Sequence, residues 1–333
     1  MATIDEVAAL AGVSVATVSR VMNNSYVVSE DKRNRVLQAA QALNYQPSTF
    51  SRSQRRADNK TILIICSVVI YDVVAGVQAM AKKLGYDVLI HYNAGRNAEL
   101  DSIKVLNNKL VDGVILLNVL MDNDDIAEIS RRYPVVHCGE YMNMPDAFQV
   151  STDNEGGAHA VVNHLISLGR KRIAFVAPDI FNGLPHFVQV REKGYRLALQ
   201  EHGLPFSPEL IIKADFSLES GYDAGRRIMA MADRPDAVFC ATDTLAIGCI
   251  HTFRDHGLAI PEDIAVAGFD NDEAAEICTP PLTTVAQPFF EIGCETVRLL
   301  TAMISEEMTI GRSVMIDYQL KIRESTDGKK AKV

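Results

Sequence analysis

Long apolar runs and the familiar catalytic motifs are both missing from this chain of 333 residues. No stretch approaches the roughly 18 apolar residues of a membrane-spanning helix, so we expect no membrane segment. Asp5 and Glu6 interrupt the opening residues, which are unlike a signal peptide and favour a cytoplasmic location. The chain has no GxSxG, HExxH, GxGxxG or GxxxxGK[ST] pattern, so the sequence indicates no enzyme class.

The six cysteines are too scattered for a disulfide framework or a structural metal site. No two of them form a CxxC pair, and the eight histidines show no ligand spacing. We therefore expect buried free thiols in a reducing compartment, with neither a metal nor a cofactor. Three aspartates near residue 123 resemble half of a calcium loop, but the glycine and the distal glutamate are missing.

The charge of the chain is unevenly distributed. The net charge is −9, yet residues 1–58 carry seven Lys and Arg against five Asp and Glu. This segment therefore has a charge of +2 and leaves −11 for the remainder. A cationic end on an acidic body fits a nucleic-acid contact made by that end alone. Because +2 is modest, we expect tight binding to need two copies of this segment.

Residues 3–23 predict two short helices joined by a tight turn. Thr3 and Glu6 have the spacing of a capping box, and Gly12 suits the end of the first helix. Ser14 can cap the second helix, whose apolar side chains turn inward. The outer face of that helix is left with Val15, Ala16, Ser19 and Arg20. Such a pair either packs as a plain helical hairpin or inserts its second helix into the DNA major groove.

A third helix and a linker follow. The helix is predicted to begin after Ser29 and to end before Pro47, because the residue before proline disfavours helix. Its expected buried stripe comprises Val36, Leu37, Ala40 and Leu43. Residues 48–60 are polar and have no apolar periodicity, which indicates a linker.

From Thr61 onward, strand-like apolar runs alternate with amphipathic helical stretches. The first series comprises Thr61–Val68, 72–84, Tyr86–His91, 98–109, Gly113–Asn118, 123–132 and Val135–Cys138. The second comprises Gln149–Thr152, 154–168, Arg172–Ala177, 189–202, Leu210–Lys213, 218–232, Ala237–Cys240, 243–256 and Ile264–Gly268. This alternation predicts two parallel α/β sheets, hence two lobes with a ligand cleft at the carboxyl ends of their strands.

Several phrases of the sequence resemble the LacI/GalR family of bacterial repressors. In the N-terminal segment these are residues 2–8, Gly12–Asn24, Val28–Glu30 and Leu43–Pro47. In the body they include Thr152–Gly157, His164–Ile173, Thr242–Gly248, Gly268–Asn271, Pro280–Thr284 and Leu320–Thr326. The resemblance covers nearly the whole chain. It implies a helix-turn-helix head on a two-lobe core like that of periplasmic binding proteins, acting as a homodimer or higher oligomer on palindromic operator DNA.

The resemblance also implies a set of DNA contacts. These are Thr3, Ser14, Val15, Ala16, Thr17, Ser19, Arg20, Asn23, Tyr45, Arg52 and Gln54. The two Arg20 side chains of a dimer would meet a central CG step. Gln54 stands where the family has a leucine that wedges into the minor groove. An amide is a poor wedge between stacked bases, so we expect weaker DNA bending than a leucine gives.

Positions that match the effector contacts of the family lie in the expected cleft. They are Asp153, Arg191, Phe216, Asp243 and Asp270, and Tyr71 is a further candidate that can replace the aromatics of a shortened family loop. Arginine supplies a planar fork of donors and aspartate accepts hydroxyl or N–H groups, so a small polar effector is expected. The loop after the first strand is shorter than in the family, and residues 179–190 are longer, with Phe181, His186 or Phe187 available to fill space. A sugar, a nucleoside and a purine therefore all remain open.

The resulting assignment has a head (1–47), a linker (48–60) and a core (61–333). Lobe one is expected at about 61–149 and 285–312, lobe two at about 150–284 and 313–324, and a tail at 325–333 that is disordered from Asp327. The expected function is an effector-controlled transcriptional regulator, most simply a repressor. A solute-binding protein with the same lobes and a sugar- or nucleotide-processing enzyme are the rivals. The DNA-binding segment argues against the first, and the lack of a catalytic constellation argues against the second.

Overall fold

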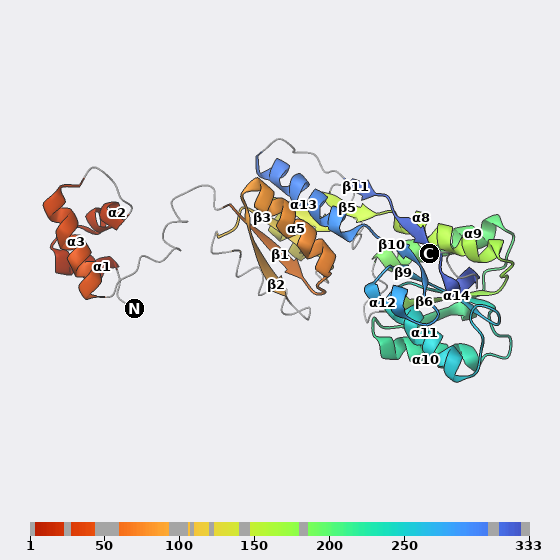
Figure 1. Cartoon of the computed structure of the whole chain (residues 1–333). Helices are drawn as coiled ribbons and strands as arrows, with labels where there is room; N and C mark the ends of the chain where they lie inside the picture. The colour runs from red at the N-terminus through yellow and green to blue at the C-terminus, as the bar shows by residue number, and fades with distance from the viewer. Residues whose placement is uncertain are drawn as a thin grey trace. The chain divides into compact units, whose positions relative to one another are not determined.

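A computed structural model describes nine stretches of the chain, which form two compact units. These stretches are 4–22, 28–43, 60–92, 106, 110–119, 123–139, 147–179, 186–305 and 313–327. The smaller unit lies mainly within Met1–Asn59, and the larger takes most of the chain from Lys60 onward. Figure 1 shows the helices of the first unit and the two sheets of the second.

The described residues of the smaller unit, called the head below, form three helices. They are α1 (Ile4–Ala11), α2 (Val15–Met22) and α3 (Glu30–Ala42). Val7, Val18 and Val36 are fully buried between them, one from each helix. Leu37 was expected in this core but is 48% exposed, and the small Ala39 of α3 is buried instead. Leu37 lies outside the buried face of α3, which consists of Val36, Ala39 and Ala40.

The larger unit, the core, contains two six-stranded sheets. The first has the order β11 (Ser313–Ile316), β5 (Gln149–Thr152), β4 (Val135–Cys138), β3 (Gly113–Leu117), β1 (Thr61–Cys66) and β2 (Asp87–Tyr92). All of its neighbouring strands run parallel. β3 and β4 are buried along their whole length, as expected for strands in the interior of a parallel sheet.

Two helices pack closely together on the first sheet. α5 (Tyr71–Leu84) and α13 (Phe289–Ile304) lie side by side in Figure 1 and share an apolar cluster with β1 and β3. Glycine allows this close approach. A Cβ added to Gly76 would lie 2.0 Å from the carbonyl oxygen of Phe290, and one added to Gly293 would lie 2.2 Å from that of Val73. A further helix, α7 (Asn123–Ser130), precedes β4.

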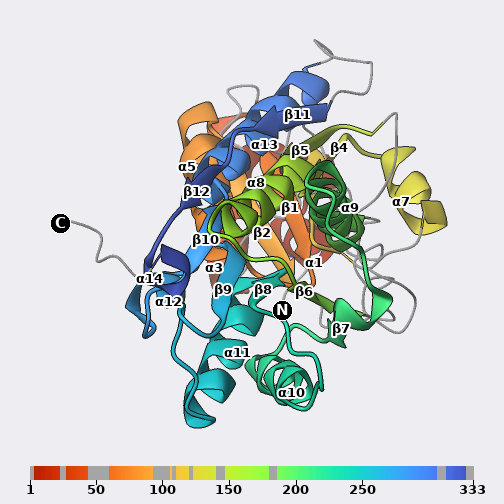
Figure 2. The ribbon, with the colours of Figure 1, turned by 90° about the vertical axis from the view of Figure 1, so that its right-hand side faces the viewer.

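The second sheet is parallel except for its last strand. Its order is β12 (Gln319–Lys321), β10 (Thr283–Ala286), β9 (Ala265–Asp270), β8 (Ala237–Cys240), β6 (Ile173–Pro178) and β7 (Ile211–Ala214). β12 pairs with β10 in the antiparallel sense, and the two strands lie at one edge in Figure 2. The C-terminal segment is thereby part of this sheet.

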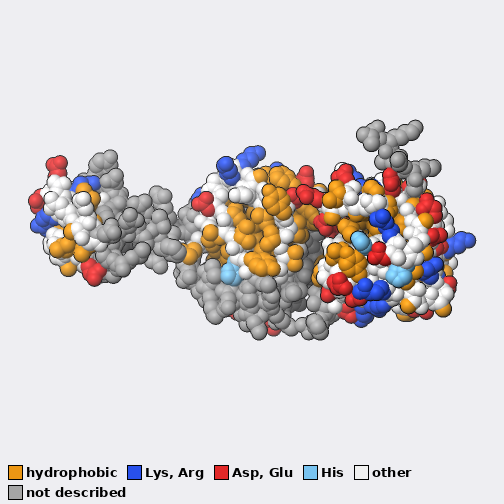
Figure 3. Space-filling view, turned by 60° about the horizontal axis from the view of Figure 1, so that its bottom comes forward, with side chains coloured by type: hydrophobic (Ala, Val, Ile, Leu, Met, Phe, Trp, Pro, Cys, Tyr) orange, Lys and Arg blue, Asp and Glu red, His pale blue; other side chains and the backbone are white. Residues whose placement is uncertain are grey.

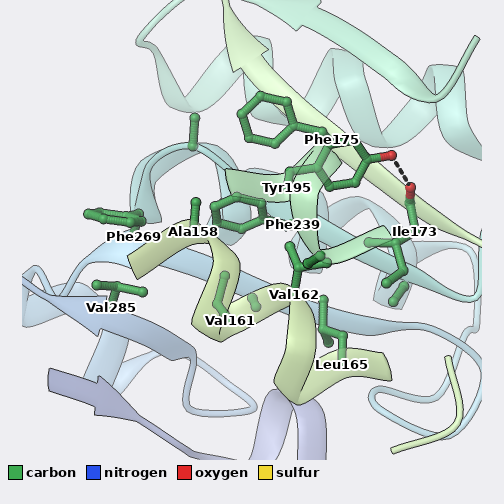
Figure 4. Packing of buried hydrophobic residues seen from close by; sticks show 14 of the residues in the cluster. Ala158, Val161, Val162, Leu165, Ile173, Phe175, Tyr195, Phe239, Phe269 and Val285 are labelled. Carbon is green, nitrogen blue, oxygen red and sulfur yellow. Dashed lines mark hydrogen bonds between the residues drawn. The ribbon is translucent and has the colours of Figure 1, made fainter. Parts of the chain in front are cut away.

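Four helices cover the two faces of the second sheet. α8 (Asn154–Ser167) and α9 (His186–Glu201) pack on one face, and α10 (Leu218–Met229) and α11 (Asp243–Asp255) on the other. Figure 4 shows the first of these layers, in which Phe175 stacks on Tyr195 with ring centroids 5.5 Å apart. The buried Tyr195 hydroxyl donates to the carbonyl oxygen of Ile173 at 2.9 Å. Short helices elsewhere in the described core are η1 (Pro208–Leu210), α12 (Glu273–Ile277) and α14 (Glu324–Asp327).

The sheets correct the expected lobe boundaries in three places. β5 and β11 belong to the first sheet, although residues 150–152 and 313–316 were assigned to the second lobe. β10 belongs wholly to the second sheet and ends at Ala286, two residues later than expected. The chain thus passes between the sheets after β5, after β10 and between β11 and β12. The order of the strands along the sequence does not show which sheet each strand joins.

The second lobe also extends beyond its expected end at residue 324, because α14 continues to Asp327. Ser325 is fully buried and Thr326 is 3% exposed, both within α14. The Ser325 hydroxyl donates to the carbonyl oxygen of Val266 at 2.6 Å, near the start of β9. Two polar residues that read as tail therefore anchor the end of the chain to the second sheet.

Among the described residues, no helix is long and apolar enough to cross a membrane. Cys66, Cys138, Cys240 and Cys249 are buried free thiols, as the spacing of the cysteines predicted. Cys278 and Cys294 are also free but only half-buried. The described part of the chain contains no group of three His, Cys, Asp or Glu side chains arranged to hold a metal ion.

Candidate functional site

The outer face of α2 is the first candidate site. The Ser14 hydroxyl accepts from the amide of Thr17 at 3.3 Å and lies 3.0 Å from the Thr17 hydroxyl, which caps the helix as predicted. Val18 is buried against the other two helices, and this fixes which side of α2 faces outward. On that outer side Val15 is 39% exposed and Arg20 is exposed.

The turn between α1 and α2 has the predicted geometry. Gly12 has a φ of 61°, in the left-handed region that a glycine adopts without strain. The guanidinium of Arg35, on α3, donates to the Gly12 carbonyl oxygen at 3.0 Å. Arg35 thus ties the third helix to the turn that precedes α2.

Several predicted DNA contacts fall outside the described residues. They are Thr3, Asn23, Tyr45, Arg52 and Gln54. Ala16 and Ser19 lie on α2, but their side chains are not among those described. The described part of this face thus consists of Ser14, Val15, Thr17 and Arg20.

The second candidate site lies at the carboxyl end of the second sheet, around Arg191. This arginine of α9 is only 3% exposed. Its Nε donates to Asn154 Oδ1 at 2.8 Å, and a terminal nitrogen donates to the carbonyl oxygen of Ala241, just after β8. Its other terminal nitrogen lies 3.4 Å from Asp270 Oδ1. Arg191 and Asp270, each predicted as a ligand contact, are thus paired with each other, and Arg191 is also held by two further protein groups.

Asp270 ends β9 in an unusual backbone conformation. Its φ is 115°, and that of the next residue, Asn271, is 59°, so two successive non-glycine residues lie at positive φ. Asp270 Oδ1 also accepts from Gln287 Nε2 at 2.7 Å. Burial raises the pKa of Asp270 to about 6, with the Arg191 charge acting in the opposite direction. Asp270 is thus protonated at a higher pH than an exposed aspartate is.

Aromatic rings surround this ion pair. The Arg191 guanidinium lies over the ring of Phe269 at 3.6 Å and over that of Phe187 at 4.8 Å from their centroids. Phe269 is fully buried, whereas Phe187 is half-buried. Phe216, which is 42% exposed, has its ring centroid 6.2 Å from that of Phe187. The partly exposed pair of Phe187 and Phe216 can stack on a flat ligand next to the polar groups.

Asp243 supports the site from behind. It is fully buried, its Oδ1 accepts from the Thr284 hydroxyl at 2.6 Å, and its Oδ2 accepts from the Asp272 amide at 2.8 Å. Its carboxylate also occupies the space beside Gly268, where an added Cβ would lie 2.2 Å from Oδ1. Burial raises the pKa of Asp243 well above its ordinary value, and the charge of Asp270 adds to this effect.

The described interactions of two other predicted effector residues lie outside this cluster. Asp153 accepts from the Gly156 amide at 2.8 Å and caps α8. Tyr71 is the first residue of α5 on the first sheet and is 80% exposed. No described contact joins Tyr71 to the residues around Arg191.

Two polar residues of the site, Asn154 and Gln287, were not predicted, although Asn154 lies in the family-like stretch Thr152–Gly157. Asn154, 3% exposed, orients Arg191, and Gln287 orients Asp270. Asn154 follows the predicted Asp153, and Gln287 follows β10, which neighbours β9 in the sheet. The paired strands β9 and β10 were the available signal, because groups after adjacent parallel strands meet at the same sheet edge.

Both parts of this architecture are similar to known protein families. Residues 3–48 match the family model "Bacterial regulatory proteins, lacI family", and residues 162–326 match "Periplasmic binding protein-like domain". The transcriptional repressor CytR of Escherichia coli K12 is 36% identical over 331 residues, which cover 98% of this chain and 96% of CytR. The regulator NtdR of Bacillus subtilis is 34% identical, covering 98% and 100% of the two chains.

Solved structures agree with the sequence comparisons. A complex of the regulator CelR with cellobiose superposes with a TM-score of 0.75 at 31% identity, covering 98% of this chain and 100% of CelR. A Lac repressor dimer bound to operator and an anti-inducer gives a TM-score of 0.75 at 26% identity, covering 98% and 99%. The head, the two parallel sheets and full-length identity above 30% lead to one conclusion: this chain belongs to the LacI family of bacterial transcriptional regulators.

Proposed function

We propose that this protein is a homodimeric repressor that binds a palindromic operator and changes its affinity for that operator when a small polar effector binds in the second lobe. The similar proteins include regulators named as repressors, such as CytR, and none of those cited above is named as an enzyme. Because its proposed partner is chromosomal DNA, we assign the protein to the bacterial cytoplasm.

The outer face of α2 supports the DNA-binding part of the proposal. Arg20 is exposed on this face and can pair with the O6 and N7 atoms of a guanine, while the exposed Val15 can contact a thymine methyl group. The hinge remains a proposal from sequence alone, since Gln54 lies outside the described residues. We expect Gln54 to bend the operator less than a leucine would.

The observation that carries the effector proposal is the arrangement of Asp270. Both described hydrogen bonds to its side chain end on Oδ1, and 18% of the side chain is exposed. Oδ2 is therefore the oxygen that we assign to the ligand, as an acceptor for hydroxyl or N–H groups. Phe187 and Phe216 supply an aromatic surface beside it. A cyclic ligand with one flat face and adjacent donors fits this chemistry, which describes sugars, nucleosides and purines.

An apolar surface on the first lobe supports the proposed homodimer. Strand β2 is the last strand at one end of the first sheet, and its Leu89, Ile90 and Tyr92 are 46%, 48% and 57% exposed. Val68 and Val69, shortly after β1, are 53% and 50% exposed. Figure 3 shows a broad apolar area on this lobe. Apolar surface of this extent on an edge strand favours burial against a second copy.

Isothermal titration calorimetry with a defined panel tests the effector proposal. The panel comprises cytidine, adenosine, hypoxanthine and cellobiose, one or more for each expected class. We expect at least one compound to bind the wild-type protein, and Asp270→Asn to weaken that binding about 10- to 100-fold, because a hydrogen bond to a charged group is lost. A compound that binds both proteins equally would exclude Asp270 as a ligand contact.

A further inference from the structure

We propose that Arg323, near the C-terminus, is a positioning residue that holds the Asp270–Asn271 turn in its effector-binding conformation. This inference rests on the proposed function of Asp270, but it concerns a different segment of the chain. It assigns a role in the effector response to residues 323–326, which read as the end of the last strand and the start of a tail in the sequence.

The turn needs external support because its backbone is unfavourable. Asp270 and Asn271 have φ angles of 115° and 59°, and residues with side chains adopt this region only when their surroundings fix them. Asparagine tolerates the left-handed conformation better than most residues do, but aspartate at 115° lies outside the usual left-handed well. The groups that bind this turn therefore determine where the Asp270 carboxylate lies.

Arg323 is one of these groups. One terminal nitrogen of its guanidinium donates to Asn271 Oδ1 at 2.8 Å, and the other donates to the carbonyl oxygen of Leu282 at 2.8 Å. The Asn271 amide donates in turn to the Thr284 hydroxyl at 3.3 Å. The planar guanidinium thus bridges the turn after β9 and the residue just before β10. Lysine cannot make this bridge with fixed geometry, because it lacks the fork of donors.

The chain around Arg323 is itself firmly held. Its amide donates to the Thr283 hydroxyl at 2.8 Å, and the hydroxyl of Thr326 lies 2.7 Å from the same Thr283 oxygen. The Ser325 hydroxyl accepts from the Thr283 amide at 2.8 Å. His164, on α8, lies 2.8 Å from the Thr326 hydroxyl. Arg323 therefore approaches the turn from a rigid base, which is what a positioning residue requires.

The position of Arg323 separates it from the ligand contacts. Each of its described side-chain hydrogen bonds ends on a protein oxygen, Asn271 Oδ1 or the Leu282 carbonyl. Its influence on the effector thus passes through Asn271 to Asp270. Removing Arg323 should free the turn to leave the positive-φ conformation, and the Asp270 carboxylate would then point elsewhere.

Hydrogen exchange tests this role without any ligand. In Arg323→Met we expect the Asn271 and Asp272 amides to exchange about tenfold faster or more, since both lie in the turn, while amides within α11 keep their rates. Arg227→Met is the matched control. Arg227 is exposed in the same lobe and donates to the Lys213 carbonyl oxygen at 2.7 Å, on the far strand β7. Unchanged exchange at Asn271 and Asp272 in Arg323→Met would overturn the proposal.

Calorimetry with the same four-compound panel then distinguishes positioning from simple stabilisation. For a compound that binds the wild type, Arg323→Met should weaken binding about tenfold or more. Asn271→Gly should restore much of that affinity in the Arg323→Met background, because glycine adopts positive φ without a side-chain anchor. General destabilisation of the lobe would not be rescued at residue 271, so a failure of this rescue contradicts the proposal. If no compound binds the wild type, the proposed effector classes fail, and exchange alone decides the role of Arg323.

Discussion

The titration of one carboxylate, Asp270, links the chemistry of the site to its surroundings. Its ordinary pKa of 3.8 is raised to about 6 by burial, so the neutral form is favoured in the folded state. Protonation of Asp270 therefore stabilises the folded protein. This contribution is fully present below the pKa of 3.8 in the unfolded chain, and it is lost as the pH rises through the folded pKa of about 6. A ligand that donates hydrogen bonds, in contrast, prefers the carboxylate.

We therefore predict that effector affinity rises with pH while the contribution of Asp270 to stability falls. At pH 5, about one unit below the folded pKa, roughly a tenth of Asp270 is ionised, so binding should be about tenfold weaker than at pH 7. Calorimetry across this range measures the effect. Asp270→Asn is the control, and it should bind weakly with no such slope. An identical pH profile in both proteins would assign the titration to another group.

A second residue-scale prediction concerns Arg20 on α2. Because its side chain is exposed on the outer face, we expect it to pair bidentately with a guanine of the operator. Arg20→Ala should cost about 1–3 kcal/mol of binding free energy and relax the base preference at one step of each half-site. Binding selection on randomised half-sites measures both. A uniform loss on all sequences would instead identify Arg20 as a phosphate contact.

At this scale the sequence singled out Arg191 and Asp270 as separate ligand contacts, but neither the contact between them nor the residues that support it. Arg191 and Asp270 matched family positions, and the structure brings them to 3.4 Å of each other. Asp243 was expected to face the ligand, but it is fully buried beneath the turn after β9. Its direction depends on the space beside Gly268 and on contacts with Thr284, both distant in sequence. Local pattern carries no information on such contacts.

Among the elements, the contact between α5 and α13 makes a sharp stability prediction. A methyl group at Gly76 would lie 2.0 Å from a backbone carbonyl oxygen, which cannot move without displacing α13. Gly76→Ala should therefore lower the free energy of unfolding by about 1–3 kcal/mol or more through overpacking. Gln78→Ala, on the exposed side of the same helix, should have little effect. If chemical denaturation gave the same free energy of unfolding for both variants, α5 and α13 could move apart without loss of stability, which would contradict the prediction.

The elements themselves were well predicted, and their assembly was not. The alternation of runs predicted Val135–Cys138 and Ala237–Cys240 to the residue, because buried parallel strands are continuous apolar stretches. β5 was predicted with correct bounds but assigned to the wrong sheet. Its pairing with β11, more than 160 residues later, is fixed by tertiary contacts. The apolar pattern of a strand shows that the strand is buried, but it does not show which strands pair with it.

For the whole molecule, the prediction concerns the apolar surface on β2. A charge at Leu89, which is 46% exposed, would be buried against the partner in the proposed homodimer. Leu89→Asp should shift the protein to monomers in sedimentation experiments and weaken operator binding, because two linked heads bind far more tightly than one. Leu168→Asp, at a 39% exposed leucine that ends α8, is the control and should stay dimeric. Monomers in the control alone, or dimers in both, would place the interface elsewhere.

The central claim is that the effector site around Asp270 controls the binding of DNA by the head. The most direct measurement is fluorescence anisotropy of a labelled operator, taken from the DNA upstream of the gene for this protein, with and without a compound that binds in calorimetry. We predict that the compound changes the operator affinity of the wild type by about fivefold or more. In Asp270→Asn, at the same compound concentration, the ratio of the two affinities should approach one. The same ratio in both proteins would contradict the account.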